Sequence, residues 1–410
     1  MKLRNLTIFL LLFIFQQMHA KNYYVSIHGN DASNGTIEQP FATLAHAQEV
    51  VEPGDTVYIR GGVYRLFEKD IMNDTGWYVR VFDMKKNGMP DHRICYMGYP
   101  GERPIFDLTA IRPERRRISV FYVEGSYLHF RNFEIVGTQV TIKGHTQSEC
   151  ISVRGGSNNI FENLSMHDGM AIGFYLTAGC NNLVVNCDAY NNYDNYSEGA
   201  KGGNVDGFGA HLLDEKMTGN VFRGCRAWWN SDDGFDLINC KSPVLIDNCW
   251  SFYNGYQPGT LLPAGDGTGF KAGGYGMKNR VNNIPKQIPM HEVTNCVAYY
   301  NKNKGFYANH HLGGIRWTDN VAYRNPSNYC MLNRKSVEKV IDVEGYGHIL
   351  ERNVSIGPRR KGWHLIDVDT TRCQIKDNRF EDSLGNPDYP MLRHVELLFQ
   401  PRKPDGTLPF

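Results

Sequence analysis

The segment NSDDGFDLINC, from Asn230 to Cys240, holds three carboxylates within five residues, Asp232, Asp233 and Asp236. Carboxylate oxygens of this kind are the ligands that hard cations such as Ca²⁺ prefer. Aspartate and glycine also favour turns for purely local reasons, so the segment alone does not separate a metal site from a turn. The distinction depends on which residues the rest of the chain places beside these three.

A repeat of about two dozen residues runs through the chain. Each copy has an aromatic residue three positions after its first residue and an asparagine two positions later. The first residues are Cys187, Cys225, Cys249, Cys296 and Asn320, at intervals of 38, 24, 47 and 24 residues. A base period of 23 to 25 residues with insertions fits one coil of a right-handed parallel β-helix, three short strands joined by three turns. We therefore predict an all-β, single-domain solenoid.

Stacked coils lie roughly 4.8 Å apart, so equivalent residues should form ladders along the solenoid. The cysteines are interpreted as small buried side chains, and their proximity leaves open whether any form disulfides. The asparagine amides should hydrogen-bond from coil to coil. The aromatic ladder comprises Tyr190, Trp228, Phe252, Tyr299 and Tyr323, and the asparagine ladder comprises Asn192, Asn230, Asn254, Asn301 and Asn325.

The two ends of the chain depart from the repeat. Residues 1–20 have the basic start, apolar run and small-residue cleavage site of a secretory signal peptide, which leaves 21–410 as the β-helix domain. Residues 21–65 are predicted to form an N-terminal cap that includes a short amphipathic helix around 41–51. The segment 385–410 breaks the pattern, and we expect it to pack as a cap over the other end.

The composition excludes some partners. A formal net charge of +1 gives no overall field that would attract nucleic acid or an anionic membrane. No later stretch reaches the length of a membrane span, and no cysteine follows the apolar run where a bacterial lipid anchor would need one. We expect an exported protein, secreted or periplasmic, and monomeric.

A second recurring unit, glycine followed by an aromatic residue, sets the register of the coils. Asp206 and Asp233 each stand one residue before this glycine, and Asp236 and Lys271 each stand two residues after it. Asp206 should therefore stack on Asp233, and Lys271 should lie one coil beyond Asp236. The pairs are Gly173-Phe174, Gly207-Phe208, Gly234-Phe235, Gly269-Phe270, Gly305-Phe306 and Gly362-Trp363.

This register would crowd four carboxylates, Asp206, Asp232, Asp233 and Asp236, into a small patch. Neighbouring like charges raise one another's pKa, and a bound hard cation removes that conflict. Ca²⁺ tolerates the irregular geometry of such a patch, so these four aspartates are the predicted ligands of a calcium ion. Stacking across coils is difficult to explain as local turn preference, although turn aspartates without metal remain the alternative.

A metal with a lysine beside it suits abstraction of a proton next to a carboxylate. A cation that binds the carboxyl group of a uronate withdraws charge and acidifies the hydrogen at C5. Lys271, held near that cation, is pushed toward the neutral form that a general base requires. Loss of the C5 proton with departure of the C4 oxygen is β-elimination, which leaves an unsaturated uronate.

Several motifs resemble the family 9 polysaccharide lyases, the pectate and rhamnogalacturonan lyases. They are NVDGF, CRAWWNSDDGFDL, GDGTGFKAGG and VTNCVAYYNKNKGF. The resemblance covers almost all of residues 21–410 and implies a right-handed parallel β-helix that acts on a pectic polysaccharide. It also implies that Asp206, Asp232, Asp233 and Asp236 bind the catalytic Ca²⁺ and that Lys271 abstracts the proton.

Further basic residues are candidates for substrate binding. Lys304 follows Asp233 in the register two coils on and could pair with a second carboxylate of the substrate. His310 and its neighbour His311 lie on the same coil as Lys304, and Arg334 stands in the motif MLNRKS. Solvent-exposed turns are the alternative for each of them.

Two other functions fit a β-helix with stacked aspartates. A glycoside hydrolase of the polygalacturonase type would use aspartates and water without metal, but its usual GHG and RIK strings do not occur. A non-enzymatic surface protein would use the stacked polar residues only as ladders. Within the lyase interpretation, the sequence leaves open homogalacturonan or rhamnogalacturonan I, endo or exo action, and the general acid.

Overall fold

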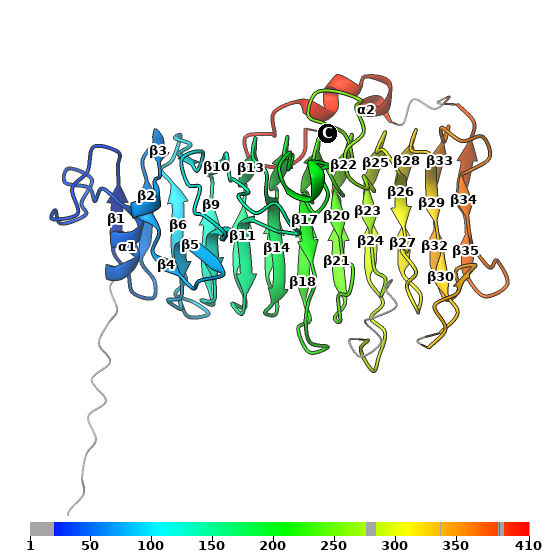
Figure 1. Ribbon diagram of the computed structural model, residues 1–410, viewed down its shortest axis with the longest axis horizontal. Helices are drawn as coiled ribbons and strands as arrows, with labels where there is room; N and C mark the ends of the chain where they lie inside the picture. Colours follow the sequence, from blue (N-terminus) through cyan, green and yellow to red (C-terminus); the bar gives the residue numbers. More distant parts are fainter. Residues whose placement is uncertain (1–19, 276–283, 337, 384, 386–388, 410) are drawn as a thin grey trace, which may run out of the picture.

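The computed structural model describes residues 20–275, 284–336, 338–383, 385 and 389–409. The predicted signal peptide therefore lies outside the described residues except for Ala20. The described chain winds into an elongated stack of coils that runs from the N-terminal to the C-terminal part (Figure 1). Within these ranges, no helix is long and apolar enough to cross a membrane. The predicted all-β, single-domain solenoid is confirmed.

Sheet A forms one side of the stack and is parallel throughout. Phe161 pairs with Val184, Val184 with Phe222 and Phe222 with Ile246, so the sheet repeats with the intervals of the sequence repeat. Its strands are β1 (Asn22–Val25), β2 (Thr56–Ile59), β6 (Ile94–Gly98), β9 (Leu128–Arg131), β12 (Ile160–Glu162), β15 (Leu183–Val185), β18 (Asn220–Arg223), β21 (Val244–Asp247), β24 (Glu292–Thr294), β27 (Arg316–Thr318), β32 (Ile349–Glu351) and β35 (Gln374–Lys376).

Sheet B carries the aromatic ladder on its outer face. In β19, for example, Ala227 points into the core while Arg226 and Trp228 point outward, because successive side chains of a strand alternate between faces. Its strands are β3 (Val63–Arg65), β7 (Ile105–Asp107), β10 (Glu134–Val136), β13 (Ser165–His167), β16 (Asp188–Tyr190), β19 (Arg226–Trp228), β22 (Trp250–Phe252), β25 (Val297–Tyr299), β28 (Val321–Tyr323), β33 (Val354–Ile356) and β36 (Arg379–Glu381).

Sheet C holds the residues for which the sequence predicts chemistry. All its pairings are parallel except that of β4 with β5. Its strands are β4 (Asn73–Asp74), β5 (Tyr78–Met84), β8 (Arg117–Val123), β11 (Glu149–Arg154), β14 (Ile172–Ala178), β17 (Phe208–Ala210), β20 (Phe235–Asp236), β23 (Phe270–Lys271), β26 (Lys304–Tyr307), β29 (Ser327–Cys330) and β34 (Leu365–Ile366); β30 (Asn333–Arg334) and β31 (Asp342–Val343) form a separate antiparallel pair.

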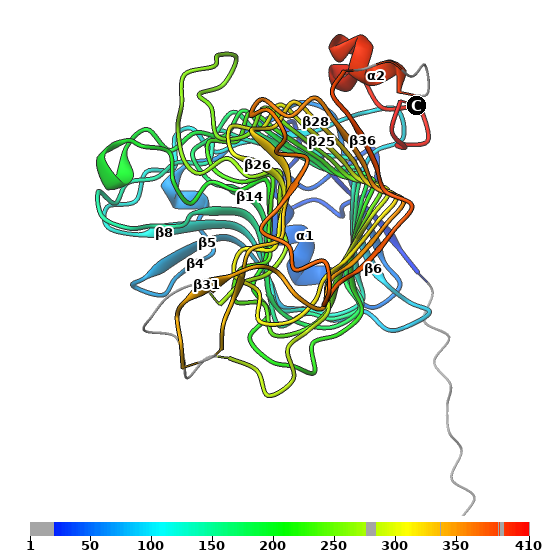
Figure 2. The same cartoon turned by 90° about the vertical axis from the view of Figure 1, so that its right-hand side faces the viewer.

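The helices are few and short. The chain forms α1 (Leu44–Val50) and α2 (Pro390–Arg393), with 3₁₀ turns η1 (Glu68–Asp70), η2 (Ser197–Gly199) and η4 (Val395–Phe399). Thr43 caps α1 by accepting the His46 N–H at 3.1 Å, and α1 buries Leu44 and Ala47. Figure 2 looks along the stack and shows α1 across its interior, at the N-terminal end seen in Figure 1. The predicted N-terminal capping helix is confirmed.

The asparagine ladder is present as predicted. The side-chain amide of Asn192 donates to Asn230 at 3.0 Å, Asn230 donates to Asn254 at 3.1 Å, and Asn254 donates to Asn301 at 3.1 Å. Each of these side chains is fully buried. Because every amide serves as both donor and acceptor, the ladder connects consecutive coils at the turn between sheets B and C.

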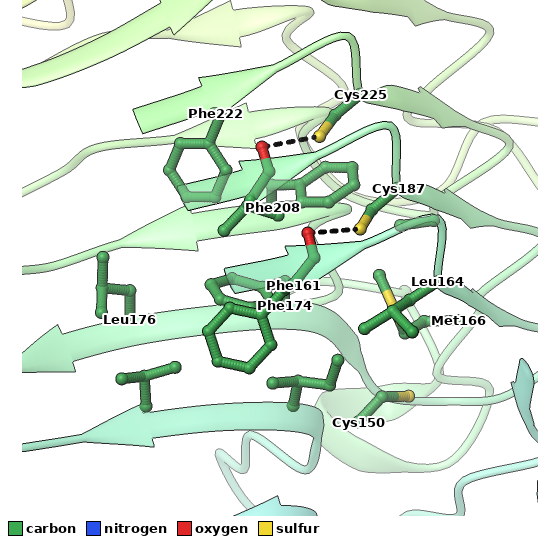
Figure 3. Packing of buried hydrophobic residues seen from close by; sticks show 14 of the residues in the cluster. Cys150, Phe161, Leu164, Met166, Phe174, Leu176, Cys187, Phe208, Phe222 and Cys225 are labelled. Carbon is green, nitrogen blue, oxygen red and sulfur yellow. Dashed lines mark hydrogen bonds between the residues drawn. The ribbon is translucent and has the colours of Figure 1, made fainter. Parts of the chain in front are cut away.

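The cysteines of the repeat are small buried side chains, as interpreted from the sequence. The thiols of Cys187 and Cys225 donate to the backbone carbonyls of Phe161 and Val184 at 3.4 and 3.5 Å (Figure 3). All ten cysteines lie in the described ranges and are free thiols. The phenyl rings of the interior pack beside them, so the thiols fill space in the hydrophobic core.

The C-terminal segment corrects one prediction, because it does not cover the end of the solenoid. It runs back along the outer face of sheet B (Figures 1 and 2), where Leu398 and Leu408 join the cluster around Trp228. Burying this apolar outer face is the physical reason for the path. The last coil keeps Phe380 48% exposed, so the C-terminal end of the stack stays open to solvent.

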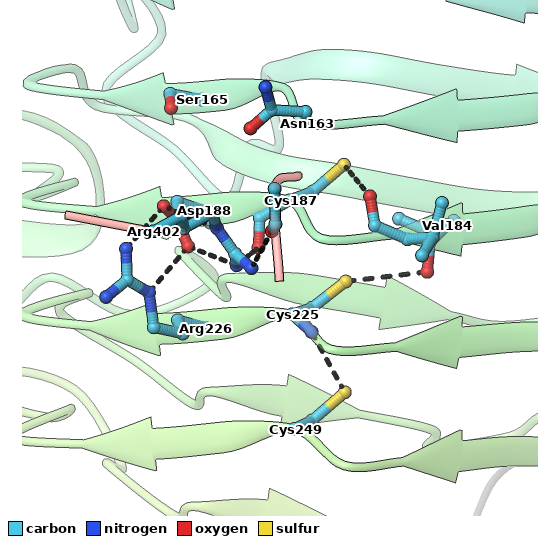
Figure 4. Close-up of polar contacts among 12 residues, drawn as sticks. Asn163, Ser165, Val184, Cys187, Asp188, Cys225, Arg226, Cys249 and Arg402 are labelled. Carbon is cyan, nitrogen blue, oxygen red and sulfur yellow. Dashed lines mark hydrogen bonds and ion pairs between the residues drawn. The ribbon is translucent and has the colours of Figure 1, made fainter. Parts of the chain in front are cut away.

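A buried ion-pair network fastens this segment to the solenoid. Asp188 of β16 pairs with Arg226 of β19 at 2.8 Å and with Arg402 of the C-terminal segment at 2.6 Å (Figure 4). Burial alone would raise the pKa of Asp188, but the charges of Arg402 and Arg226 lower it to about 2. The carboxylate is therefore charged wherever the protein is folded at ordinary pH.

One of the glycine–aromatic pairs is out of register. Tyr329 pairs with Leu365, so the aromatic position of the last sheet C strand is occupied by Leu365. Trp363 lies two residues earlier, where its carbonyl accepts the N–H of Asn328, and its side chain is 37% exposed. The assignment of Gly362-Trp363 to the register was wrong, because the turn before β34 places the tryptophan outside the sheet.

We expect Asn254→Ala to lower the free energy of unfolding by at least about 2 kcal/mol, because it leaves buried groups of the neighbouring coils without partners. The urea midpoint of the variant measures this loss. The matched control is Asn34→Ala, which removes an exposed asparagine. Equal midpoints for the two variants would contradict a stabilising role of the ladder.

We expect Asp188→Asn to cost about 3 to 5 kcal/mol at neutral pH, because it leaves two largely buried guanidinium groups without a counter-charge. The lowered pKa means that the stabilisation is complete above about pH 4 and disappears as the pH falls through about 2. Urea midpoints of both proteins as a function of pH check this. A difference between them that persists undiminished to pH 2 would contradict the assignment.

Candidate active site

Sheet C positions the predicted site by alternating inward and outward residues. Phe208, Phe235, Phe270 and Phe306 pair in register and point into the core, with ring centroids 4.8 to 5.0 Å apart. Because alternate residues face opposite ways, the residues after them point outward. Those residues include Asp236 and Lys271, which pair directly between β20 and β23. The predicted register of these two residues is confirmed.

The glycine before each phenylalanine is required by close packing between coils. A Cβ on Gly234 would lie 2.0 Å from the hydroxyl oxygen of Ser251 and 2.7 Å from the carbonyl oxygen of Gly269. Neither distance leaves room for a methyl group. This crowding brings the residue before each glycine close to its equivalent in the next coil, and the backbone N–H of Asp233 donates to the carboxylate of Asp206 at 3.1 Å.

Three of the four predicted ligands come together. One carboxylate oxygen from each of Asp206, Asp233 and Asp236 lies within 4.8 Å of the other two, and all three residues are buried. Oxygens that bind one Ca²⁺ at about 2.3–2.6 Å can lie at most about 5 Å apart. The group therefore has the donor atoms and the dimensions of a calcium site.

Asp232 lies at the edge of this group. Its two carboxylate oxygens accept the backbone N–H groups of Asn204 at 2.7 Å and Asp266 at 2.6 Å. It lines the same hollow, of about 460 Å³, as Asp206 and Asp236. The structure thus places Asp232 beside the other three carboxylates while using its oxygens to fix two neighbouring loops.

Lys271 reaches into the acidic group. Its ammonium lies 2.7 Å from the carboxylate of Asp233 and 3.0 Å from that of Asp236, and the side chain is 12% exposed. Burial lowers the pKa of Lys271, but the negative charges of Asp233 and Asp236, followed by Asp206 and Asp232, raise it well above its ordinary value. With these carboxylates charged and no other cation among them, the lysine is held protonated.

The carboxylates themselves are costly to keep charged. Burial raises the pKa of Asp206 well above its ordinary value, and the charge of Asp236 raises it further. Burial also raises the pKa of Asp233 to about 7, against the lowering effect of Lys271. One ammonium therefore does not compensate the group, and a divalent cation among these oxygens would.

Two residues beside the site were not singled out as site residues from the sequence. The hydroxyl of Tyr175 lies 2.8 Å from Nδ1 of His211, and Nε2 of His211 lies 3.9 Å from the carboxylate of Asp236. Both line the hollow. Tyr175 occupies the register position of Asp236 two coils earlier, so the glycine–aromatic pattern could have identified it. His211 follows β17 and carries no such signal.

The two histidines of the predicted substrate group differ. His310 lines the hollow, and its Nε2 lies 3.2 Å from the carboxylate of Asp342. Burial lowers the pKa of His310, an effect that Asp342 partly opposes. His311 is fully buried, accepts the N–H of Gly274 at 3.2 Å and donates to the carbonyl of Pro289 at 2.8 Å. Its contacts hold backbone in place and leave it outside the hollow.

The other two basic candidates, Lys304 and Arg334, also differ in their position relative to the hollow. Lys304 begins β26, the strand after that of Lys271, and its ammonium lies 4.4 Å from the centre of the Tyr307 ring. Arg334 is only 1% exposed, and its guanidinium donates to the backbone carbonyl of Tyr275 at 2.8 Å. The structure thus brings Lys304 near the site on the outer face of sheet C, whereas Arg334 does not line the hollow.

The chain is similar to known proteins along most of its length. The sequence model of the family described as "Pel9A-like, right handed beta helix region" matches residues 23–353. The chain is 31% identical over 395 residues to "Pectate lyase L" of Dickeya dadantii (strain 3937), an alignment that covers 94% of this chain and 81% of that protein.

Two solved structures are similar along almost the whole chain. One, titled "Rhamnogalacturonan lyase", has 49% sequence identity and a TM-score of 0.90, covering 95% of each chain. Another, "Crystal structure of pectate lyase Pel9A", has 29% identity and a TM-score of 0.73, covering 95% of this chain and 87% of that one. The chain therefore belongs to the Pel9A-like right-handed β-helix family of polysaccharide lyases.

Proposed function

We propose that the protein is an exported, calcium-dependent lyase that cleaves galacturonate-containing pectic backbones by β-elimination. The observation that carries the proposal is the position of Lys271, whose ammonium lies within 3.0 Å of two members of the buried carboxylate group. A surface β-helix without activity would have no need of a buried lysine in an acidic cluster. The lyases among the similar proteins support the same reaction class.

Lys271 is the proposed general base, and the hollow beside it is the proposed place of the scissile bond. The lysine nitrogen takes the proton from C5 of the uronate, and the electrons of that C–H bond form the C4–C5 double bond. The bond from C4 to the glycosidic oxygen breaks, and that oxygen leaves with a proton supplied by water. The products are a new reducing end and an unsaturated uronate.

Asp206, Asp232, Asp233 and Asp236 are the proposed ligands of the cation. Calcium bound there would acidify the C5 hydrogen through the uronate carboxyl and would counter the negative charge that keeps Lys271 protonated. The chain's own contribution is the fixed spacing of the carboxylates on two adjacent coils, with Lys271 on the next. The Tyr175–His211 pair, next to Asp236, is positioned to restrain that carboxylate from the other side.

Rhamnogalacturonan I is the proposed preferred backbone. The structure titled "Rhamnogalacturonan lyase" shares 49% of its residues with this chain, against 29% for pectate lyase Pel9A, and superposes more closely. The chemistry of the described surface supports the same choice, because a hollow on the strands of sheet C that follow β23 is lined by both cationic and apolar side chains, among them Lys304, Arg360 and Trp363. A backbone that alternates neutral and acidic sugars would match such a surface. A higher kcat/KM on polygalacturonate than on rhamnogalacturonan I would contradict this preference.

We expect Lys271→Arg to lower kcat by about 10² to 10⁴-fold, because a guanidinium keeps the positive charge but cannot accept the proton. The rate of formation of unsaturated product from rhamnogalacturonan I, followed by ultraviolet absorbance, measures this. The matched control is Lys216→Arg, on an exposed turn, which should leave the rate unchanged. An active Lys271→Arg enzyme would contradict the assignment of the base.

We expect Asp233→Asn to weaken calcium binding by at least about tenfold, because it removes one charged ligand from the centre of the group. Isothermal titration of the variant with Ca²⁺ measures the affinity directly, independently of activity. Asp91→Asn removes an exposed carboxylate elsewhere on the surface and serves as the control. Calcium affinity unchanged in Asp233→Asn would place the cation elsewhere.

A further inference from the structure

A second hollow, of about 660 Å³, lies on sheet C toward the C-terminal end of the stack. Lys304 of β26, Ser327 of β29 and Ile366 of β34 contribute to its floor. These strands follow β23, the strand of Lys271, in the same sheet. At about 4.8 Å per strand, the hollow begins about 5 Å from the strand of Lys271 and ends about 14 Å from it. A polymer that lies along the solenoid through the candidate active site would therefore cross this hollow.

Three cations line the hollow, Lys302, Lys304 and Arg360, and none of them has a carboxylate partner among the described residues. In the described part of the chain, no carboxylate oxygen lies within 4 Å of the ammonium of Lys304 or of the guanidinium of Arg360, whose contacts are with an amide and with aromatic rings. Lys304 donates to the side chain of Asn303 at 3.1 Å and lies over the ring of Tyr307. Both contacts fix the position of the ammonium without neutralising its charge.

An exposed tryptophan forms one wall. Trp363 is 37% exposed, and the guanidinium of Arg360 lies 4.4 Å from the centre of its ring. This cation–π contact holds the indole and the charge side by side. An exposed tryptophan outside the register of sheet C does not stabilise the hydrophobic core. Its ring can instead pack against the apolar face of a sugar.

The remaining charged groups of the hollow do not neutralise its positive charge. Lys302 donates to the backbone carbonyls of Ala264 and Gly265, which fixes its ammonium beside a loop without neutralising its charge. Asp367 is an acidic group of the hollow, and its carboxylate accepts the thiol of Cys330 at 3.2 Å. Three cations without carboxylate partners in the described chain, one carboxylate and an exposed indole leave a surface that is cationic and partly apolar.

We propose that this hollow is a binding subsite for the same uronate-containing backbone. Trp363 packs against a sugar ring, while Arg360 and Lys304 pair with the carboxylate of a neighbouring uronate. The inference rests on the proposed function, because it takes the occupant to be the substrate of the site at Lys271. It adds a specificity element three strands away that acts on substrate binding and leaves the chemical step unchanged.

The test compares steady-state kinetics on rhamnogalacturonan I for the parent enzyme, Trp363→Ala and Arg360→Ala. Each variant should raise KM by about tenfold with kcat within twofold of the parent value, because the lost contacts bind substrate and do not touch the reacting bond. The controls are Phe380→Ala, which removes an exposed aromatic ring from sheet B, and Arg352→Ala, which removes an exposed cation from the turn after β32 of sheet A. Trp363→Phe should restore most of the affinity.

The dependence of KM on ionic strength distinguishes the role of the Arg360 charge from that of the Trp363 ring. Salt screens exposed charges, so the increase in KM caused by Arg360→Ala should shrink at high salt while that caused by Trp363→Ala should persist. Unchanged KM in both variants, on a parent enzyme that forms unsaturated product, would overturn the subsite alone. Absence of unsaturated product from the parent enzyme on every pectic backbone would overturn the proposed function, and the subsite with it.

Discussion

The in-register stacking of parallel coils is the constraint on which the rest of the structure depends. Phenylalanines stack in the core at 4.8 to 5.0 Å, and asparagines join the same coils by buried hydrogen bonds. Because the core and the asparagine ladder fix this register, the outward-pointing residues of neighbouring coils cannot move apart. Asp236 and Lys271 must then lie one strand apart, however unfavourable their environment.

The acidic group shows what this rigidity makes possible. Buried carboxylates repel one another and raise one another's pKa, so a flexible chain would move them into water. Here the hydrophobic core supplies the free energy that holds them together, as active sites generally draw on the stability of their scaffold. The result is a preformed set of oxygen donors with a lysine inside it, on a sheet long enough to bind several sugars of a polymer.

Much of this arrangement could be predicted from the sequence, because one glycine–aromatic pattern reports both the core and the outer face of sheet C. The pattern placed Lys271 beside Asp236 and stacked Asp233 on Asp206. It could not place residues outside the repeat: His211 follows a strand, and the C-terminal segment has no periodic signal to show that it lies along sheet B. Gly362-Trp363 was assigned to the register because the dipeptide fits the pattern, although the turn before β34 places the tryptophan outside the sheet.

A crystal structure of the protein grown with Ca²⁺, with the cation located by its anomalous scattering, tests most directly whether the stacked aspartates bind calcium beside Lys271. We predict one strong site whose ligands include oxygens of Asp206, Asp233 and Asp236 at about 2.3–2.6 Å, with the Lys271 nitrogen released from its ion pairs toward the hollow. A calcium ion bound only elsewhere, or none at saturating concentration with Lys271 still paired to Asp233, would contradict it.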